Sequence, residues 1–295
     1  MSDIKIYPLH KTFAKKAHID LEAYEKMYVD SIENPNDFWS KQAKDFLLWE
    51  KPWKEVNSYD FYTGKTAWFS EGQLNVSVNC IDRHLPSKAD QPAIIWEGDN
   101  PKDSEIITFR KLSDQVNKLS NALRSRNVKK GDRVCIYMPM IPQAAYAMLA
   151  CARIGAIHSV VFGGFSPEAL KDRIIDSDCH VVITADEGVR GGKNIPLKAN
   201  ADSAMRNCPL VHTCLVVAHT GNNVDWLPER DVWYHEAIEN EATHCPPESI
   251  NSEDPLFILY TSGSTGKPKG VLHTTAGYLL QVAMTHKYVF DYKSD

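Results

Sequence analysis

The sequence predicts an α/β fold with a mainly parallel sheet and helices on both faces. Three observations predict it. From residue 94 onward, short apolar runs alternate with segments of helical periodicity, the strand-to-helix connections are short, and the composition is globular, with 43% hydrophobic and 24% charged residues. Buried parallel strands read as nearly continuous apolar runs, and short connections favour helices that cross between parallel strands.

Charge and length exclude several classes of protein. The 295 residues carry 33 Lys and Arg against 38 Asp and Glu, which gives 33 − 38 = −5. Nucleic acids and anionic membranes attract clustered Lys and Arg, so this balance argues against both kinds of partner. The length suggests one large or two modest domains, at about 150 residues each. The sequence gives no indication of the oligomeric state.

The cysteines and the apolar runs of the sequence indicate in which cellular compartment the protein lies. The seven cysteines are odd in number and form no C-x-x-C motif, which is typical of free thiols in a reducing cytosol. The first eleven residues lack the apolar core of a signal peptide. The uncharged run 134–152 is interrupted by Pro139 and Pro142, which favours a buried strand and helix over a membrane span. We therefore expect a cytoplasmic protein.

Residues 1–80 are rich in aromatic side chains, and we expect them to form a helical N-terminal region. One expected helix has apolar residues at helical spacing: Leu21, Tyr24, Tyr28 and Ile32. A second, with Asn36 as its candidate cap, has a common apolar face: Trp39, Ala43 and Phe46. We expect these short helices to pack against a larger body and to contribute no chemistry.

Caps and periodicity predict the elements of residues 81–295. Thr108 is expected to cap a helix that ends before the turn at 129–132 and whose apolar face is Leu112, Val116, Leu119 and Leu123. Further helices are expected from Pro142 to Ala152, from Ser166-Pro167 to about Ser177, and over 277–285. Strands are expected at 133–138, 158–162, 180–184, 214–218, 256–260 and 271–273.

A segment rich in glycine and hydroxyl groups follows the expected strand at 256–260. It consists of Thr261, Ser262, Gly263, Ser264, Thr265, Gly266, Lys267, Pro268, Lys269 and Gly270. Glycines allow positive φ and close backbone approach, so successive N–H groups can converge on an anion, while hydroxyls and lysines add donors and charge. Residues 255–290 contain no Asp or Glu. The segment therefore predicts a polyphosphate site in a neighbourhood free of repelling charge.

Other interpretations of this segment fit less well. A flexible linker rarely lies between two apolar strands. A Walker A loop requires G-x-x-x-x-G-K-[ST], but Pro268 follows Lys267 and Thr261 stands at the position of the first glycine. The pair at 163–164 is too short for the dinucleotide fingerprint G-x-G-x-x-G. NTPases of the P-loop type and NAD-dependent enzymes are therefore disfavoured.

We expect no metal ligand and no catalytic residue within this chain. His158 and His273 lie beside expected strands without a second ligand at metal-binding spacing, which favours packing roles. The pair Asp186-Glu187 precedes Gly188 and is interpreted as two turn carboxylates, not as an acid–base pair.

The loop at 260–270, Y-T-S-G-S-T-G-K-P-K-G, resembles the phosphate-binding signature of the AMP-forming acyl-CoA synthetases, the adenylate-forming enzymes. Other matching segments are N-C-I-D-R-H-L at 79–85, I-I-W-E-G-D at 94–99, Y-M-P-M-I-P at 137–142, M-L-A-C-A-R-I-G-A at 148–156, H-S-V-V-F-G-G-F-S-P-E-A-L at 158–170 and D-P-L-F-I-L-Y-T-S-G at 254–263. N-P-N-D-F-W at 34–39 is similar to the N-terminal extension of the acetate-activating members. The resemblance covers essentially the whole chain.

The resemblance implies an ATP-dependent ligation of acetate to coenzyme A. The loop at 261–270 would hold the β- and γ-phosphates of ATP while acetate attacks the α-phosphorus, and the CoA thiol would then displace AMP. The products would be acetyl-CoA, AMP and pyrophosphate, with Mg²⁺ neutralising the polyphosphate. Propionate or another short acid is an alternative substrate. A noncatalytic nucleotide- or CoA-binding module and a phosphate-releasing NTPase are alternatives from other classes.

The resemblance also implies a coenzyme A site at residues 187–196. Arg190 and Lys193 suit its phosphates, and Gly191 and Gly192 let the backbone come close. The adenine would be walled by Phe162, Gly163, Gly164, Ile195 and Pro196. Lys193 stands where the family has Arg. The positive charge is therefore kept, but the planar guanidinium that can bind a phosphate through two parallel hydrogen bonds is lost. Without the resemblance, R-G-G-K indicates only a basic turn.

Family members continue well beyond the last residue of this sequence. The resemblance places there the glutamate that serves the magnesium ion, the acetate pocket and the domain with the catalytic lysine. It implies that residues 1–80 are the extension and residues 81–295 an incomplete part of the large N-terminal domain of an adenylate-forming enzyme. We therefore expect this chain to be inactive by itself.

Overall fold

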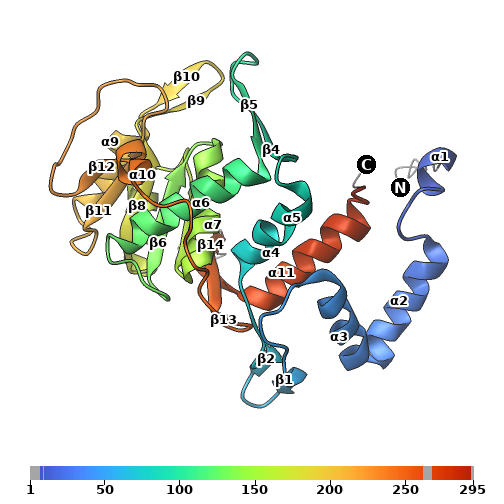
Figure 1. Ribbon diagram of the computed structural model, residues 1–295. Helices are drawn as coiled ribbons and strands as arrows, with labels where there is room; N and C mark the ends of the chain where they lie inside the picture. The colour runs from blue at the N-terminus through green and yellow to red at the C-terminus, as the bar shows by residue number, and fades with distance from the viewer. Residues whose placement is uncertain (1–6, 9, 262–267, 294–295) are drawn as a thin grey trace, which may run out of the picture.

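The computed structural model describes residues 7–8, 10–261 and 268–293, and its centre is a seven-stranded sheet (Figure 1). The strand order is β12-β11-β8-β6-β7-β14-β15. Neighbouring strands are parallel throughout, except that β15 runs antiparallel to β14. Their bounds are β6 Arg133–Met138, β7 Ile157–Phe162, β8 Cys179–Ala185, β11 Thr213–Val217, β12 Asp231–Trp233, β14 Pro255–Thr261 and β15 Lys269–Thr274. The predicted α/β class is confirmed.

Helices cover both faces of the sheet. On one face pack α6 (Phe109–Arg124), α7 (Pro142–Ile154) and α10 (Tyr234–Glu239). On the other face pack α8 (Pro167–Asp176) and α9 (Leu197–Met205). The uncharged run 134–152 therefore forms a strand and a helix, as predicted. In the described part of the chain, no helix has both the length and the apolar character that crossing a bilayer requires.

Local sequence signals account for the helix ends. The Thr108 side chain accepts a hydrogen bond from the Lys111 N–H at the start of α6, and Ser166 caps α8 in the same way. Gly155 ends α7 with a left-handed φ of 71°, the conformation that glycine adopts at low cost. The predicted face of α6 is buried in the main core: Leu112, Val116, Leu119 and Leu123.

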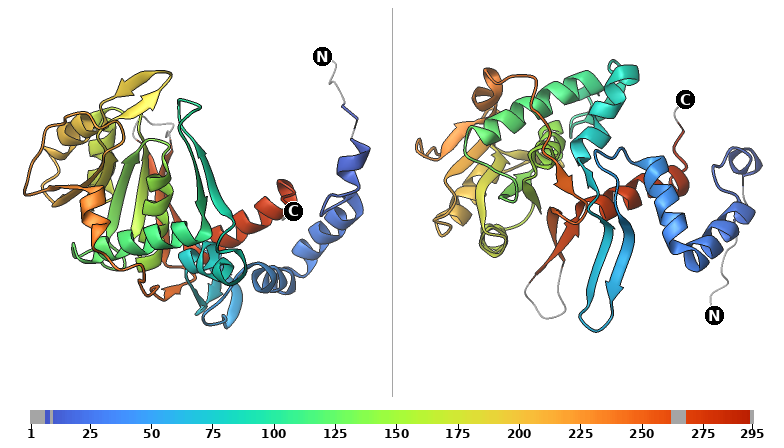
Figure 2. Two further views of the ribbon diagram at one scale, coloured as in Figure 1. Left: turned by 45° about the horizontal axis from the view of Figure 1, so that its top comes forward. Right: turned by 60° about the horizontal axis from the view of Figure 1, so that its bottom comes forward.

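The N-terminal region contains α1 (Lys11–Ala14), α2 (Leu21–Glu33), α3 (Pro35–Phe46) and the hairpin of β1 (Glu55–Asp60) and β2 (Lys65–Ser70). Two expectations are wrong here. Asn36 lies inside α3, because Pro35 takes the first turn and Asn34 precedes it. The helix α2 extends away from the sheet (Figure 2), and its apolar stripe is exposed, at 56% for Tyr24 and 66% for Ile32.

A second hydrophobic core joins the two ends of the chain. Ala43, Leu47, Phe69 and Leu74 of the N-terminal region pack with Ala276, Leu279 and Leu280. The last three belong to α11 (Thr275–Met284), the helix predicted at 277–285. The N-terminal region therefore buries its aromatic face only with the help of a helix from the other end of the described chain, which its own sequence does not indicate.

Apart from the strand at residues 92–97, where the predicted strand–helix alternation begins, several short elements have no clear sequence signal. The further strands are β3 (Gln73–Leu74), β4 (Pro92–Glu97), β5 (Ser104–Thr108), β9 (Gly188–Arg190), β10 (Lys193–Ile195) and β13 (Ile250–Asn251), and they form two-stranded pairs β4–β5, β9–β10 and β3–β13. The further helical turns are α4 (Val76–Cys80), η1 (Asp82–His84), α5 (Leu85–Lys88) and η2 (Thr285–Val289). Such elements are too short for periodicity to distinguish them from loops.

Candidate functional site

The carboxyl ends of the parallel strands meet along one edge of the sheet. β6, β7, β8, β11 and β14 end there at residues 138, 162, 185, 217 and 261. β7 pairs with one side of β6 and β8 with the other, and the helices that follow β6 and β7 lie on opposite faces. Open parallel sheets bind ligands outside such strand ends, near the point where the order reverses. Two predicted sites begin there, at Phe162 and Thr261.

The predicted phosphate segment lies at the end of the β14–β15 hairpin. Thr261 pairs with Lys269, and Tyr260 pairs with Gly270. Gly270 lies within β15, and a Cβ there would be 3.1 Å from Ile258 Cγ2 and 3.2 Å from Tyr260 Cε1. Of the two properties predicted for this glycine, close backbone approach is therefore the one that the structure uses, since Gly270 is not among the residues with positive φ. The other predicted residues, Ser262, Gly263, Ser264, Thr265, Gly266 and Lys267, lie outside the described residues.

The expectation of a neighbourhood free of repelling charge is wrong. Asp172 and Asp176 of α8 line a cavity of about 250 Å³ together with Pro268 and Tyr260. The Tyr260 hydroxyl donates a hydrogen bond to Asp176 Oδ2 at 2.7 Å. Burial, and then this contact with the Asp176 carboxylate, raises the pKa of Tyr260. The sequence window 255–290 is free of acids, but a helix from elsewhere in the chain brings two of them close.

Arg173 adds a positive charge at the same place. Its side chain is buried, its Nη1 donates to the Ala169 carbonyl at 2.7 Å, and its guanidinium carbon lies 5.2 Å from the centre of the Tyr260 ring. It is also the charged residue in the lining of an apolar cavity of about 510 Å³ that extends from β4 to the ends of β7 and β14. Sequence reasoning missed this residue, because a lone Arg on a helix carries no distinguishing pattern.

The predicted coenzyme A segment forms the β9–β10 hairpin. Gly191 and Gly192 make its turn with φ of 57° and 72°, so the turn expected at R-G-G-K is confirmed. The Arg190 guanidinium carbon lies 5.5 Å from the centre of the Phe162 ring. The two predicted halves of the coenzyme site, far apart in sequence, thus meet at the carboxyl edge. Lys193 is exposed at the same turn.

The two glycines of the segment after β7 lie close to neighbouring atoms. A Cβ on Gly163 would be 3.1 Å from the Met138 carbonyl oxygen, and one on Gly164 would be 2.5 Å from the Phe162 ring. The Tyr137 hydroxyl donates to the carbonyl oxygens of Gly163 and Phe165, at 3.2 and 2.8 Å. The backbone after Phe162 is therefore held in place. Ile195 packs partly against the main core, and exposed Pro196 precedes α9.

Asp186 fixes the neighbouring loops. Its carboxylate is fully buried and accepts backbone N–H groups of Glu187, His219, Thr220 and Gly221 at 2.6 to 3.2 Å. Glu187 accepts from Asn194 Nδ2 of β10 and from Asn222 Nδ2, at 2.8 and 2.6 Å. Both carboxylates therefore hold loops together, in agreement with their interpretation as turn residues.

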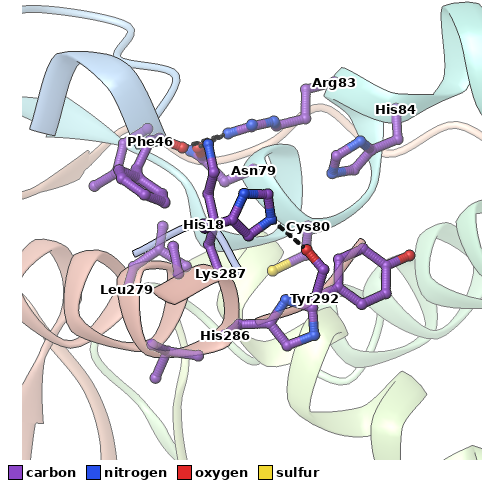
Figure 3. A pocket seen from close by; sticks show the side chains of 13 residues that line it. His18, Phe46, Asn79, Cys80, Arg83, His84, Leu279, His286, Lys287 and Tyr292 are labelled. Carbon is purple, nitrogen blue, oxygen red and sulfur yellow. Dashed lines mark hydrogen bonds between the residues drawn. The ribbon is translucent and has the colours of Figure 1, made fainter. Parts of the chain in front are cut away.

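A further cavity lies away from this edge. It has a volume of about 580 Å³ and lies where the first and last described segments meet, with His18, Arg83 and Lys287 in its lining (Figure 3). His18 Nε2 is 2.8 Å from the Tyr292 carbonyl oxygen. The lining contains none of the residues of the two predicted sites. Elsewhere in the described ranges, no three His, Cys, Asp or Glu side chains converge in an arrangement suited to a metal ion.

Comparisons with known proteins agree with this arrangement. Residues 81–295 match the family described as AMP-binding enzyme, and residues 24–80 match the acetyl-coenzyme A synthetase N-terminus. The acetyl-coenzyme A synthetase of Saccharophagus degradans is 64% identical over 99% of this chain and 45% of its own length. Acetyl-coenzyme A synthetase 2 of Pseudomonas aeruginosa is 60% identical over the same shares, 99% and 45%.

The chain spans about 45% of the length of these relatives. The family match nevertheless covers most of the chain, including the strands whose carboxyl ends form the candidate site. The chain therefore belongs to the AMP-binding enzyme family and carries, ahead of the matched domain, the N-terminal region found in acetyl-coenzyme A synthetases.

Proposed function

We propose that this chain is the N-terminal part of an AMP-forming acetate–CoA ligase. Residues 1–80 are its extension, and residues 81–295 are the first part of the domain that holds ATP and CoA. Acetate is the proposed acid because the relatives are named acetyl-coenzyme A synthetases. Propionate is the second candidate, since the described residues include no assigned acid pocket. A cytoplasmic location is proposed because all seven cysteines are free thiols.

One observation carries the proposal. β7 and β14 are adjacent parallel strands, with Phe257 opposite His158 and Ile258 opposite Ser159. Their carboxyl ends therefore bring the start of the 261–270 segment beside the Phe162 turn and the β9–β10 hairpin. A ligase that makes an acyl-adenylate and then a thioester must bring ATP and the CoA thiol to one place, and the carboxyl edge offers it.

The chemistry proceeds in two displacements. An acetate oxygen attacks the α-phosphorus of ATP, and the bond from that phosphorus to the bridging oxygen breaks with release of pyrophosphate. The CoA sulfur then attacks the acetyl carbon, loses its proton to solvent or a base, and AMP leaves with the bonding electron pair. In this scheme Thr261, Lys269 and the loop between them hold the phosphates, and Arg190 and Lys193 hold those of CoA. No catalytic residue is assigned within this chain.

A magnesium ion would arrive with the ATP phosphates. Within the described ranges, no three carboxylates or other metal ligands converge. The acids nearest to Pro268, Asp172 and Asp176, lie on one helix, and Asp176 already accepts the Tyr260 hydroxyl. These residues do not fit a protein-held metal site, so no step is derived through one.

Labelled pyrophosphate exchange into ATP tests the reaction type. In a chain extended to the length of the relatives, exchange should require the acid and should be faster with acetate than with propionate. An NTPase would release phosphate without exchange, and a binding module would do neither. The 295-residue chain alone should show no turnover. Acetyl-CoA formation by this chain alone would contradict the assignment of essential groups to the remaining length.

Lys269→Ala tests the phosphate segment in the same extended chain. Lys269 is exposed and makes no ion pair among the described residues, so its removal should leave the fold intact. The KM for ATP should rise about tenfold, as expected for one lost charge-assisted hydrogen bond. Lys102→Ala, an exposed change on the β4–β5 hairpin, is the matched control. If Lys269→Ala and Lys102→Ala had equal KM values for ATP, Lys269 would not be part of the phosphate site.

A further inference from the structure

The turn of the β9–β10 hairpin already binds an oxyanion, which belongs to the protein itself. The Gly191 N–H donates to Asp99 Oδ1 at 3.0 Å, and the Gly192 N–H donates to Asp99 Oδ2 at 2.9 Å. Asp99 comes from the loop between β4 and β5. The two hairpin tips therefore lie side by side above the carboxyl edge, as Figures 1 and 2 show. One carboxylate joins them.

The geometry of the contact is that of an anion site. Both glycines have positive φ, 57° and 72°, and this backbone points two consecutive N–H groups at one acceptor. The hydrogen bonds from Gly192 and Gly191 lower the pKa of Asp99, so its side chain is an anion at neutral pH. Carboxylate and phosphate oxygens accept such N–H groups in the same way. The turn is thus able to bind a phosphate oxygen.

The positive charges of the turn remain available. In the described ranges, neither Arg190 nor Lys193 has a carboxylate oxygen within 4 Å. Arg190 instead lies over the Phe162 ring, and Lys193 is exposed. The two amides are the hydrogen-bonded partners of Asp99, and the two cations beside them are unpaired with acids. A ligand phosphate that uses both amides and cations must take the place of the Asp99 carboxylate.

We propose that Asp99 is an internal competitor for the phosphate site of the β9–β10 turn and sets its affinity for phosphate-bearing ligands. The proposal rests on the proposed function in one respect, namely that coenzyme A is the natural ligand of this hairpin. A bound phosphate displaces the carboxylate and separates the two hairpin tips. While it is bound, the carboxylate prevents weaker anions from occupying the turn. Asp99 is therefore a specificity-determining residue and takes no part in the bond-making steps.

Inorganic phosphate tests the competition directly. The ¹⁵N-labelled 295-residue chain is titrated with phosphate, and the amide shifts of Gly191 and Gly192 give the Kd. Asp99→Ala should lower this Kd about fivefold, the size expected when one exposed ionic contact is lost. Asp103→Ala is the matched control, because it removes the same charge from the same hairpin while Asp103 makes no side-chain bond among the described residues. Its Kd should equal that of the unchanged chain.

Two results would overturn the proposal. Equal Kd values for Asp99→Ala and Asp103→Ala would show that general charge repulsion, and not displacement, is responsible. A higher Kd for phosphate in Asp99→Ala would show that the carboxylate positions the turn for its ligand. Asp99→Asn, which keeps the shape of the side chain, guards against a misfolded loop and should also lower the Kd.

A second ligand separates this proposal from the proposed function. CoA and its fragment adenosine 3′,5′-bisphosphate should shift the Phe162 resonances as well as the two glycine amides. If phosphate binds more tightly to Asp99→Ala but neither nucleotide shifts Phe162, the competitor is supported and the coenzyme assignment fails. If both nucleotides shift Phe162 with the same Kd in the unchanged chain, Asp99→Ala and Asp103→Ala, the coenzyme site is supported and the competitor fails.

Discussion

Asp186 and Asp99 hold two neighbouring loops by the same kind of bond in different surroundings. Each carboxylate accepts backbone N–H groups from a segment distant in sequence, Asp186 from residues 219–221 and Asp99 from Gly191 and Gly192. Asp186 is fully buried, whereas Asp99 and both of its donors are exposed. Water competes more strongly for the exposed donors of Asp99 than for the part-buried donors that the buried Asp186 carboxylate accepts. The comparison indicates a permanent clamp in the first case and an exchangeable contact in the second.

The largest effect is expected next to the buried clamp. The Lys198 side chain is fully buried, and its Nζ lies 2.8 Å from Asp231 and 2.7 Å from Asp202. Lys198→Met leaves the buried Asp231 carboxylate without one of its two cations. The free energy of unfolding should fall by about 3–5 kcal/mol, measured by urea denaturation. A loss below about 1 kcal/mol would show that buried and exposed ionic contacts do not differ here.

Asp186→Ala should have the next largest effect. It leaves the part-buried N–H groups of the loop after β11 without their acceptor, which should cost about 3 kcal/mol of unfolding free energy. Asp186→Asn keeps one acceptor oxygen and should cost less. Hydrogen exchange at residues 219–221 should become faster in both variants. If hydrogen exchange at residues 219–221 were unchanged in both variants, Asp186 would not hold this loop more firmly than Asp99 holds the β9–β10 turn.

The smallest effect on stability is expected from loss of the Asp99 contact, which can be followed by lowering the pH. Its pKa is lowered from 3.8 by the two glycine amides, so the contact is complete above the unfolded pKa and is lost as pH falls through the lower, folded pKa. The Gly191 and Gly192 amide shifts should be constant above about pH 5 and should change below about pH 4. Asp99→Asn should abolish this change and leave the urea midpoint unaltered. If the midpoint of the pH-dependent change in the Gly191 and Gly192 amide shifts lay above pH 3.8, the hydrogen-bonded contact with Asp99 would be contradicted.

Local patterns predicted much of the sheet region correctly. Thr108 and Ser166 cap the helices expected of them, and the strand at 133–138 has the predicted bounds. These features follow from neighbours in the chain, since a cap acts within one turn and a buried strand is a continuous apolar run. The glycine turn at 191–192 was predictable for the same reason. Apolar spacing alone misled at α2, because it cannot indicate whether a partner covers the stripe.

The candidate site was predicted only in part. The sequence indicated which residues suit phosphate and where strands precede them, but not that Asp172 and Asp176 lie beside Pro268. It gave no sign that Arg173 stacks on Tyr260 or that Asp99 occupies the glycine turn. Each of these contacts joins residues far apart along the chain, and such pairs leave no local pattern.

The amino-acid order by itself determined the α/β class and the main helices and strands. These depend on periodicity, caps and backbone freedom, which are properties of short stretches. Tertiary structure alone decided that the N-terminal region shares a core with α11, that acids approach the phosphate segment, and that a carboxylate fills the hairpin turn. The physical reason is that charge and burial depend on distance in space, and the fold sets that distance.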